Sequence, residues 1–578
     1  MSALLTIVCP LLVAAGLLPT RLRPFALFLA PWAALPAVGL ALWPETASTV
    51  ELPWVMLGVR FGLDHLTRTF ILFTALLWLC SGVYARAYLK EDRNRGRFFI
   101  FFLITMSANF AVILSQDLIS FYTFFALMGF AAYVLIVHDG SDEAYRAGRI
   151  YLTLTVVGEV CIISALFFIA GALNDLQLTQ VARHLAAAAN RELIMTLLFV
   201  GFGIKAGALL LHVWLPLAHP VAPTPASAVL SGAMIKAGLL GWLRFLPLGE
   251  IALVGWANLY MAAGLAAAFY GVIIGLTQDN PKTVLAYSSI SQMGLMTIGV
   301  GVGLAHPEKY EVALTAILVY ALHHGLAKGA LFLGVGVAKE VRNRVQQGIV
   351  IAGLLLPALA LAGAPLTSGA VAKLALKAAT AEASPFWAHW FDLLLPLAAV
   401  GTTVLMCRFL FVVWPSRETK ETHGGPGVWV SWGVLLAVVA IVPVIMTEHN
   451  IIAMLAKTVS PKMGGPVLIG SVLGGLAWYW RRLLPAWLQP AVPAGDVLVL
   501  VQRLQEWGRT LWIRAGVSDV WSTAHQWPGF LRSGVRTVNA RDFWLRQEAS
   551  LSQWASGGLL FLILMGAMFI LLLISAHS

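Results

Sequence analysis

The sequence predicts an all-α polytopic membrane protein. Of its 578 residues, 59% are hydrophobic and 11% are charged, so too little polar surface would remain to cover a water-soluble core. A membrane helix needs about 20 apolar residues to cross roughly 30 Å of hydrocarbon, and the chain has about sixteen such stretches. The alternating apolar and polar pattern of membrane β-barrels is absent. The predicted spans begin near residues 3, 25, 65, 97, 117, 149, 194, 225, 252, 283, 311, 348, 387, 428, 465 and 556.

The first apolar stretch has no basic segment before it, so we interpret it as a retained span rather than a cleaved signal. If every stretch spans once, the most basic loops fall on one face of the membrane, which the positive-inside rule makes cytoplasmic. Both termini are then expected outside. These loops account for the net charge of +11 without a nucleic-acid partner. They carry Arg21 and Arg23, then Lys90, Arg93, Arg95 and Arg97, then Lys339, Arg342 and Arg344, then Arg481 and Arg482.

Near the C-terminus, residues 496–550 are basic and rich in tryptophan, and they precede a last apolar span at 556–575. We interpret 496–550 as an amphipathic segment in the cytoplasmic interface of the membrane. A soluble tail beneath the bundle is the alternative.

The chain offers no recognisable metal or cofactor site. Its four cysteines are isolated within apolar segments and lack the spacing of a zinc or iron–sulfur site. No ligand set for haem or flavin is visible, so we expect no redox or hydrolytic chemistry in this chain. The cysteines are Cys9, Cys80, Cys161 and Cys407.

Five lysines interrupt the long apolar stretches: Lys205, Lys236, Lys328, Lys373 and Lys377. A cation near the bilayer centre costs about 3 kcal/mol on insertion scales, so such residues usually face a bundle interior or a wet cavity. Lysine also loses its proton readily when desolvated. The pattern therefore indicates charge movement inside the membrane.

Two windows predict interrupted helices. Between Lys205 and Lys236 stand prolines 216, 220, 223 and 225, which a continuous helix excludes. In the second window, GAPLTSGAVAK, a proline, two hydroxyl residues and glycines come just before Lys373. Lys373 follows Lys205 by about five predicted spans, and because five is odd, the two parts of the chain would be inverted copies.

The motifs of this central region resemble a known family. The run HVWLPLAHPVAPTPASAVLSGAMIKAGLLGWLRF, followed by NPKTVLAYSSISQMG and HHGLAKGALFLGVG, is similar to the antiporter-like proton-translocating subunits of complex I, membrane-bound hydrogenases and Mrp cation/proton antiporters. The wording looks closest to the hydrogenase and Mrp D-type branch. The resemblance implies a core of about fourteen helices, with two inverted five-helix repeats and broken helices 7 and 12. The expected division is 1–115 N-terminal spans, 116–247 first repeat, 252–414 second repeat, 428–482 C-terminal spans, 496–550 lateral-helix-like segment and 556–575 terminal anchor.

The resemblance also implies a midplane relay of lysines, histidines and water. By position, Lys205 and Lys236 match the lysines of helices 7 and 8, and Lys373 matches the exit residue of helix 12. His324 and Lys328 match the pair of helix 11.

The chain departs from the family pattern at one relay position. Ala126 stands where the fifth helix usually carries a glutamate. Glu159, in the next span, differs from Ala126 in depth by about 6 Å, roughly one helical turn. We therefore expect Glu159 to serve as the carboxylate partner of Lys205.

Several of these residues have plainer alternatives. Lys377 and Lys282 lie near span ends, where the amine can reach the headgroups. His324, beside His323, suits a packed core histidine as well as a relay member. Asp64 and Asp117 stand at span starts, so we interpret both as helix caps first and as acids at the proton entry site second.

Together the observations predict a proton-translocating subunit of a multisubunit membrane complex, with Na⁺ as the alternative coupled ion. The expected partners are other membrane subunits and the lipid bilayer, in the inner (plasma) membrane of a prokaryote. The rival hypothesis is a non-pumping scaffold or coupling subunit, for example in a bicarbonate or other solute uptake complex.

Overall fold

The structure, a computed structural model, describes residues 2–43, 49–55, 58–171, 173, 176–414, 425–445, 456–481 and 492–495. The chain divides into two units, 1–498 and 499–578. All described residues belong to the first unit. The predicted lateral-helix-like segment (496–550) and terminal anchor (556–575) lie outside the described residues.

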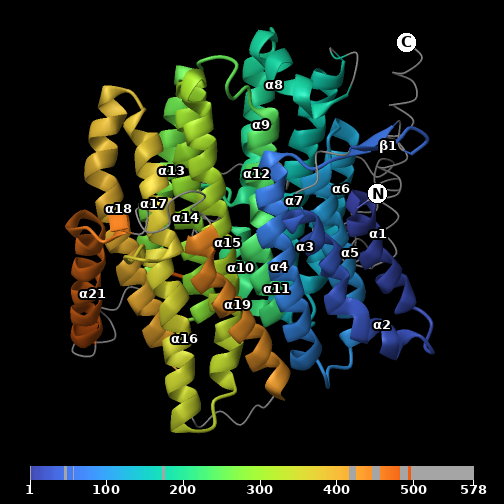
Figure 1. The fold of residues 1–578 in the computed structure, drawn as a ribbon, viewed down its shortest axis with the longest axis vertical. Coiled ribbons are helices and arrows are strands. Elements are labelled where there is room, and N and C mark those ends of the chain that lie inside the picture. Colours follow the sequence, from blue (N-terminus) through green and yellow to red (C-terminus); the bar gives the residue numbers. More distant parts are fainter. Residues whose placement is uncertain are drawn as a thin grey trace, which may run out of the picture. The chain divides into compact units, whose positions relative to one another are not determined.

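The first unit is a helical bundle, as predicted (Figure 1). Twelve helices in its described part are long and apolar enough to cross a membrane, which makes this a multi-pass membrane protein. The N-terminal elements are α1 (Ser2–Gly16), α2 (Arg23–Leu29), the 3₁₀ helix η1 (Ala30–Ala34), α3 (Leu35–Leu42), the hairpin strands β1 (Val50–Leu52) and β2 (Val59–Phe61), and α4 (His65–Tyr88).

The next five spans, which we take as the first repeat, run from α5 to α12; the predicted bounds of 116–247 leave α5 outside. Its elements are α5 (Arg95–Leu114), α6 (Leu118–Ile136), α7 (Asp142–Ala170), the short amphipathic α8 (Leu178–Ala187), α9 (Arg191–Ala206), α10 (Trp214–Val221), α11 (Thr224–Val229), the π-helix η2 (Leu230–Met234) and α12 (Ile235–Phe245). The α9–α10 pair is one interrupted span, and α11, η2 and α12 form the next span.

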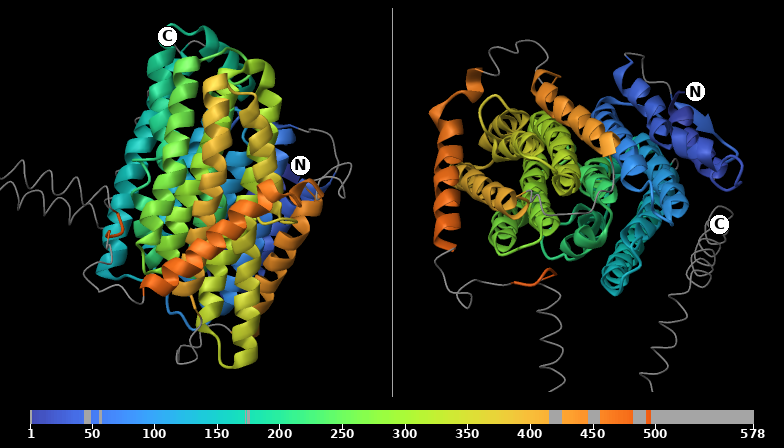
Figure 2. Two further views of the ribbon diagram at one scale, coloured as in Figure 1. Left: turned by 90° about the vertical axis from the view of Figure 1, so that its left-hand side faces the viewer. Right: turned by 90° about the horizontal axis from the view of Figure 1, so that it is seen from below.

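The second repeat follows directly, and two more helices come after it. Their elements are α13 (Val254–Leu276), α14 (Pro281–Ala305), the 3₁₀ turn η3 (Pro307–Lys309), α15 (Tyr310–Lys339), α16 (Arg344–Ala362), α17 (Ser368–Ala381), α18 (Pro385–Val412), α19 (Gly425–Ile445) and α21 (Pro461–Arg481). Figures 1 and 2 show α21 on the far side of the bundle from α1.

The fourth span of each repeat is broken, which confirms the predicted interruptions of helices 7 and 12. Gly207 (φ 70°) ends α9 and Gly363 (φ 82°) ends α16, both in the left-handed conformation that glycine adopts without strain. The first break lies at residues 207–213, just ahead of the prolines that predicted it. Pro225 instead stands in the first turn of α11, where a missing N–H does no harm.

The break between α16 and α17 is supported from outside the repeat. Leu366, with φ 65°, donates its backbone N–H to the Thr458 hydroxyl at 2.9 Å, and Thr367 caps α17. The freed backbone groups of a broken helix thus find side-chain partners, as a membrane interior requires.

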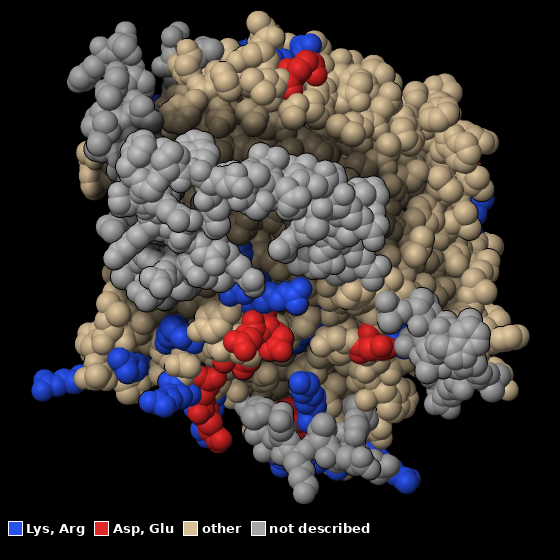
Figure 3. Space-filling model, turned by 180° about the vertical axis from the view of Figure 1, so that it is seen from behind, with Lys and Arg blue, Asp and Glu red and all other residues tan. Residues whose placement is uncertain are grey.

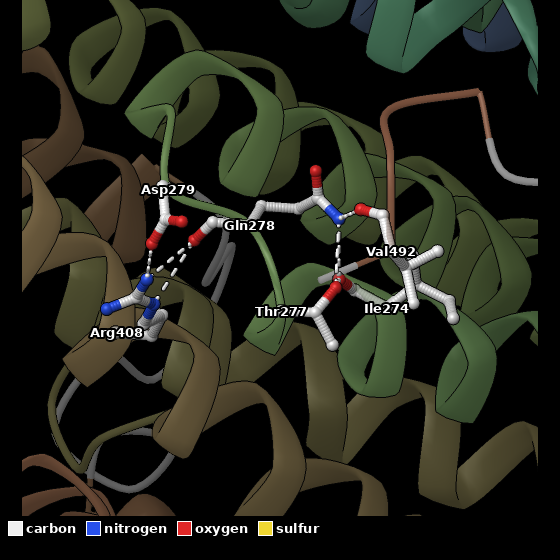
Figure 4. Close-up of polar contacts among 6 residues, drawn as sticks. All are labelled: Ile274, Thr277, Gln278, Asp279, Arg408 and Val492. Atoms are coloured by element: carbon white, nitrogen blue, oxygen red, sulfur yellow. Dashed lines mark hydrogen bonds and ion pairs between the residues drawn. The ribbon is translucent and has the colours of Figure 1, made fainter. Parts of the chain in front are cut away.

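Charged side chains gather at the lower end of the bundle (Figure 3), the end where α15 ends and α16 begins (Figure 1). At the neighbouring turn between α13 and α14, Arg408 of α18 donates to the carbonyl oxygen of Gln278 at 2.9 Å and pairs with Asp279 (Figure 4). The Gln278 side-chain amide donates to the Val492 carbonyl oxygen at 2.9 Å. This turn therefore fixes the start of α14 against both α18 and the segment 492–495.

Candidate functional site

Lys205 lies at the end of α9, immediately before the first helix break, and is 5% exposed. It lines a small, partly open cavity together with Glu159 of α7, Phe125 of α6 and Trp214 of α10. Glu159 is the only carboxylate among the lining residues. The break thus brings a lysine and an acid from different spans to one cavity.

Gly129 of α6 shows how closely the two charged groups converge. A Cβ built on Gly129 would lie 3.0 Å from Lys205 Nζ and 3.6 Å from Glu159 Oε1. Ala126, the residue at the family's usual glutamate position, is buried one turn earlier on the same helix. The Glu159 carboxylate therefore lies beside the face of α6 from which the glutamate is missing.

The other partners of Lys205 are weak. Its ammonium donates to the Tyr151 hydroxyl at 3.4 Å and lies 5.5 and 5.6 Å from the ring centroids of Phe125 and Tyr151. The Tyr151 hydroxyl in turn donates to the Gly129 carbonyl at 2.7 Å. Glu159 Oε2 is buried without a hydrogen-bond partner among the described residues. A proton or a water molecule is the natural partner for that oxygen.

Lys236 and Lys328 lie at the interface between the repeats, and both are fully buried. Lys236 Nζ donates to the Ser231 carbonyl at 2.5 Å, and Lys328 Nζ donates to the Leu285 carbonyl of α14 at 2.8 Å. Neither lysine has a carboxylate partner within ion-pair distance in the described part of the chain. Backbone carbonyls can accept from a neutral amine or from an ammonium, so both protonation states keep a hydrogen bond.

The two histidines of α15 take different positions. His324 is buried, has no hydrogen-bond partner among the described residues, and lies close enough to Lys236 and Lys328 to be influenced by both charges. His323 Nδ1 hydrogen bonds with the Ser368 hydroxyl of α17 at 2.8 Å. Lys373 donates to the Ala362 carbonyl at the second break. His323, considered from the sequence only as the neighbour of His324, thus contacts the helix that carries Lys373.

The buried His219 and the partly buried Lys282 were left out of the predicted relay. His219 of α10 stacks on Phe332 of α15, with the ring centroids 4.5 Å apart. Lys282 donates to the Ala222 carbonyl at 2.6 Å, so its amine points inward rather than toward headgroups. The signal for His219 was its place in the AHPVAPTP run, which had been used only to predict a helix break.

The relay candidates are not continuous. Within the described residues, no hydrogen bond or ion pair joins Lys205 to Lys236. Lys377 lies on the surface, where it pairs with Asp392 at 2.8 Å. It is therefore separate from the buried set.

Asp64 and Asp117 cap helices, as the sequence predicted. Asp117 accepts from the backbone N–H groups of Ser120 and Arg60 at 2.8 and 2.7 Å. Asp64 forms a capping box at the start of α4 and an ion pair with Arg244. Burial alone would raise the pKa of Asp64, but the Arg244 charge and the hydrogen bonds hold it below its usual value.

The described part of the chain contains no cluster of three or more His, Cys, Asp or Glu that would hold a metal ion. The buried lysines and histidines and Glu159 carry groups that can gain and lose protons.

The buried lysines, the histidines and Glu159 all lie within the part of the chain that matches a known protein family. Residues 115–395 match the family described as NADH:quinone oxidoreductase/Mrp antiporter, TM. Among curated relatives, hydrogenase-4 component B of Escherichia coli (strain K12) is 29% identical over 295 residues, covering 49% of this chain and 44% of that protein. Putative antiporter subunit mnhA2 of Staphylococcus saprophyticus is 31% identical over 356 residues, covering 56% and 44%. The chain thus spans about half the length of the curated relatives it matches.

Two solved structures share the fold. The Mrp complex from Dietzia sp. DQ12-45-1b matches with a TM-score of 0.71 at 20% identity, covering 96% of this chain and 62% of that one. The membrane-bound sulfane sulfur reductase, an archaeal respiratory membrane complex, matches with a TM-score of 0.65 at 19% identity, covering 82% and 99%. At these identities the likeness establishes the fold alone.

Proposed function

We propose that the chain is a proton-translocating subunit of a multisubunit membrane complex, because residues 115–395 match the family described as NADH:quinone oxidoreductase/Mrp antiporter, TM. Its partners are other membrane subunits of a hydrogenase-like, respiratory or Mrp-type assembly. Na⁺ is the alternative coupled ion. The complex lies in a prokaryotic inner membrane, with both chain termini outside.

The observation that carries the proposal is the set of buried amines held on backbone carbonyls. Lys236 and Lys328 bond to carbonyl oxygens rather than to carboxylates, so no permanent ion pair fixes their protons. Desolvation opposes the charged form of each amine, and two like charges in a low-dielectric interior repel each other. Loading one amine therefore favours unloading its neighbour.

The relay has three parts in this proposal. Lys205 is loaded beside Glu159, and the proton then passes through water to Lys236, His324 and Lys328. His323 transfers the proton to Lys373 at the second helix break. His219 and Lys282 supply a side branch at the repeat interface. The distance between Glu159 and Lys205 sets how strongly the carboxylate favours the protonated form of the lysine.

The test is proton movement in vesicles that contain the intact complex, with Lys205→Ala and Glu159→Gln compared with the wild type at matched expression. Loss of transport in both variants is expected, with assembly unchanged. Lys377→Ala is the control, because that lysine is exposed and already paired. Full transport in both test variants would favour the scaffold hypothesis, which the alanine at position 126 motivates.

A further inference from the structure

A pair of buried hydroxyls joins the two repeats between Lys236 and Lys328. Ser231 belongs to η2 in the first repeat, and Ser289 belongs to α14 in the second repeat. Their Oγ atoms lie 2.8 Å apart, and both residues are fully buried. We name this pair the serine bridge.

Each end of the serine bridge is tied to the acceptor of one relay lysine. The carbonyl of Ser231 accepts from Lys236 Nζ at 2.5 Å. Ser289 Oγ donates to the Leu285 carbonyl at 3.0 Å, and the same carbonyl accepts from Lys328 Nζ at 2.8 Å. Four hydrogen bonds thus connect the two amines.

The directions of these hydrogen bonds follow from the number of hydrogens. A serine hydroxyl has one hydrogen to donate. If Ser289 donates to Leu285, Ser231 must donate to Ser289. The Leu285 carbonyl then uses both lone pairs, one for Ser289 and one for Lys328. If Ser289 donated to Ser231 instead, one lone pair of the Leu285 carbonyl oxygen would become free to accept from Lys328 or from water.

The backbone around Ser231 is built for close approach to the helix of the second repeat that carries Lys328. Residues 230–234 form a π-helical turn, a feature found frequently at functional sites. A Cβ on Gly232 would lie 2.8 Å from the Gly325 carbonyl of α15, and a Cβ on Gly325 would lie 2.8 Å from the Gly232 carbonyl. Only glycine at both positions allows this contact without a shift of the backbone.

We propose that the serine bridge is a positioning device that couples the protonation of Lys236 to that of Lys328 across the repeat interface. This inference rests on the proposed function. The serines do not carry the proton themselves, because backbone carbonyls interrupt the path at both ends. They hold the carbonyl groups of Ser231 and Leu285, which accept from the two amines, in fixed positions. When the hydrogen bond between the serines reverses its direction, Ser289 no longer donates to the Leu285 carbonyl, and Lys328 is then the donor that remains on it.

The test compares Ser231→Ala, Ser289→Ala and the double variant in vesicles containing the intact complex. Ser291→Ala is the matched control, because Ser291 lies on the same helix, is equally buried, and donates to the Ala268 carbonyl at 2.8 Å, away from the bridge. Each bridge variant is expected to slow proton transport about five- to tenfold, the effect of about one neutral hydrogen bond. The double variant should be no slower than either single variant.

A second readout separates positioning from general stability. Loss of the bridge changes how the two amines influence each other, so the pH profile of transport should shift in Ser231→Ala and Ser289→Ala but not in Ser291→Ala. Restoring the hydroxyl group as Ser231→Thr should return the profile toward wild type. Additive losses or unshifted profiles would overturn the inference while the Lys205→Ala defect persisted. If Lys205→Ala transported normally, the proposed function would fail and the serine bridge would fail with it.

Discussion

Replacing Glu159 by Gln removes the only carboxylate from the cavity of Lys205 while preserving its size. The remaining partners of the ammonium are a long hydrogen bond to Tyr151 and two aromatic faces. Removing one member of a buried ion pair lowers the stability of a protein by about 3–5 kcal/mol, because the other charge is left buried without a partner. Lys205 and Glu159 converge on Gly129 without forming a direct ion pair, so we take a smaller loss, about 2 kcal/mol, for the stabilisation of charged Lys205. If the barrier to proton transport rises by that amount, the transport rate falls roughly thirtyfold.

The assay for this prediction is proton uptake by vesicles at matched levels of assembled complex. Glu192→Gln is the control, because it makes the same chemical change on the exposed start of the helix that carries Lys205. The double variant Ala126→Glu/Glu159→Gln returns the acid to the position that the family usually uses, and it should recover part of the lost rate. If Glu159→Gln kept the wild-type rate, or Glu192→Gln lost as much, the pairing of Glu159 with Lys205 would be refuted.

Three further predictions follow from the same contacts. Gly129→Ala should slow transport about tenfold without loss of assembly, because the added methyl would lie 3.0 Å from Lys205 Nζ and would displace that flexible amine; proton uptake and complex yield check this. Asp64→Asn should lower the thermal stability of the complex near pH 7. The folded pKa of Asp64 is depressed by Arg244, so its contribution is present above the unfolded value of about 3.9 and lost as pH falls through the folded pKa; melting curves should therefore converge in acid. Lys377→Ala should change transport less than about fivefold, because an exposed ion pair contributes about 0–1 kcal/mol, and a larger loss would return this lysine to the relay.

The sequence predicted the helices well because spans and breaks are local properties. Every predicted span up to the one near residue 465 lies on a helix, since apolar length alone sets a membrane crossing. The position of the first break was less accurate. The prolines predicted an interruption at residues 216–225, whereas the helix is interrupted at Gly207 and Leu210, both of which have left-handed φ angles. Proline restrains φ without excluding a helix's first turn.

The site was harder to predict because its contacts lie between distant helices. Buried lysines stand out in an apolar sequence, and the depth estimate was enough to nominate Glu159. Nothing local indicates that Lys282 points inward to the Ala222 carbonyl, or that Ser231 and Ser289 meet across the repeat interface. Serines are too common in membrane helices for their spacing to predict a partner.

The lysine at the centre of the proposed relay, Lys328, offers the most direct test. Lys328→Met keeps the length and apolar body of the side chain but removes the amine that donates to the Leu285 carbonyl. Proton transport should be measured in vesicles containing the intact complex, with assembly quantified in the same preparation. We predict that transport is abolished while the complex still assembles. Wild-type proton transport in an assembled Lys328→Met complex would contradict a proton path through these buried lysines.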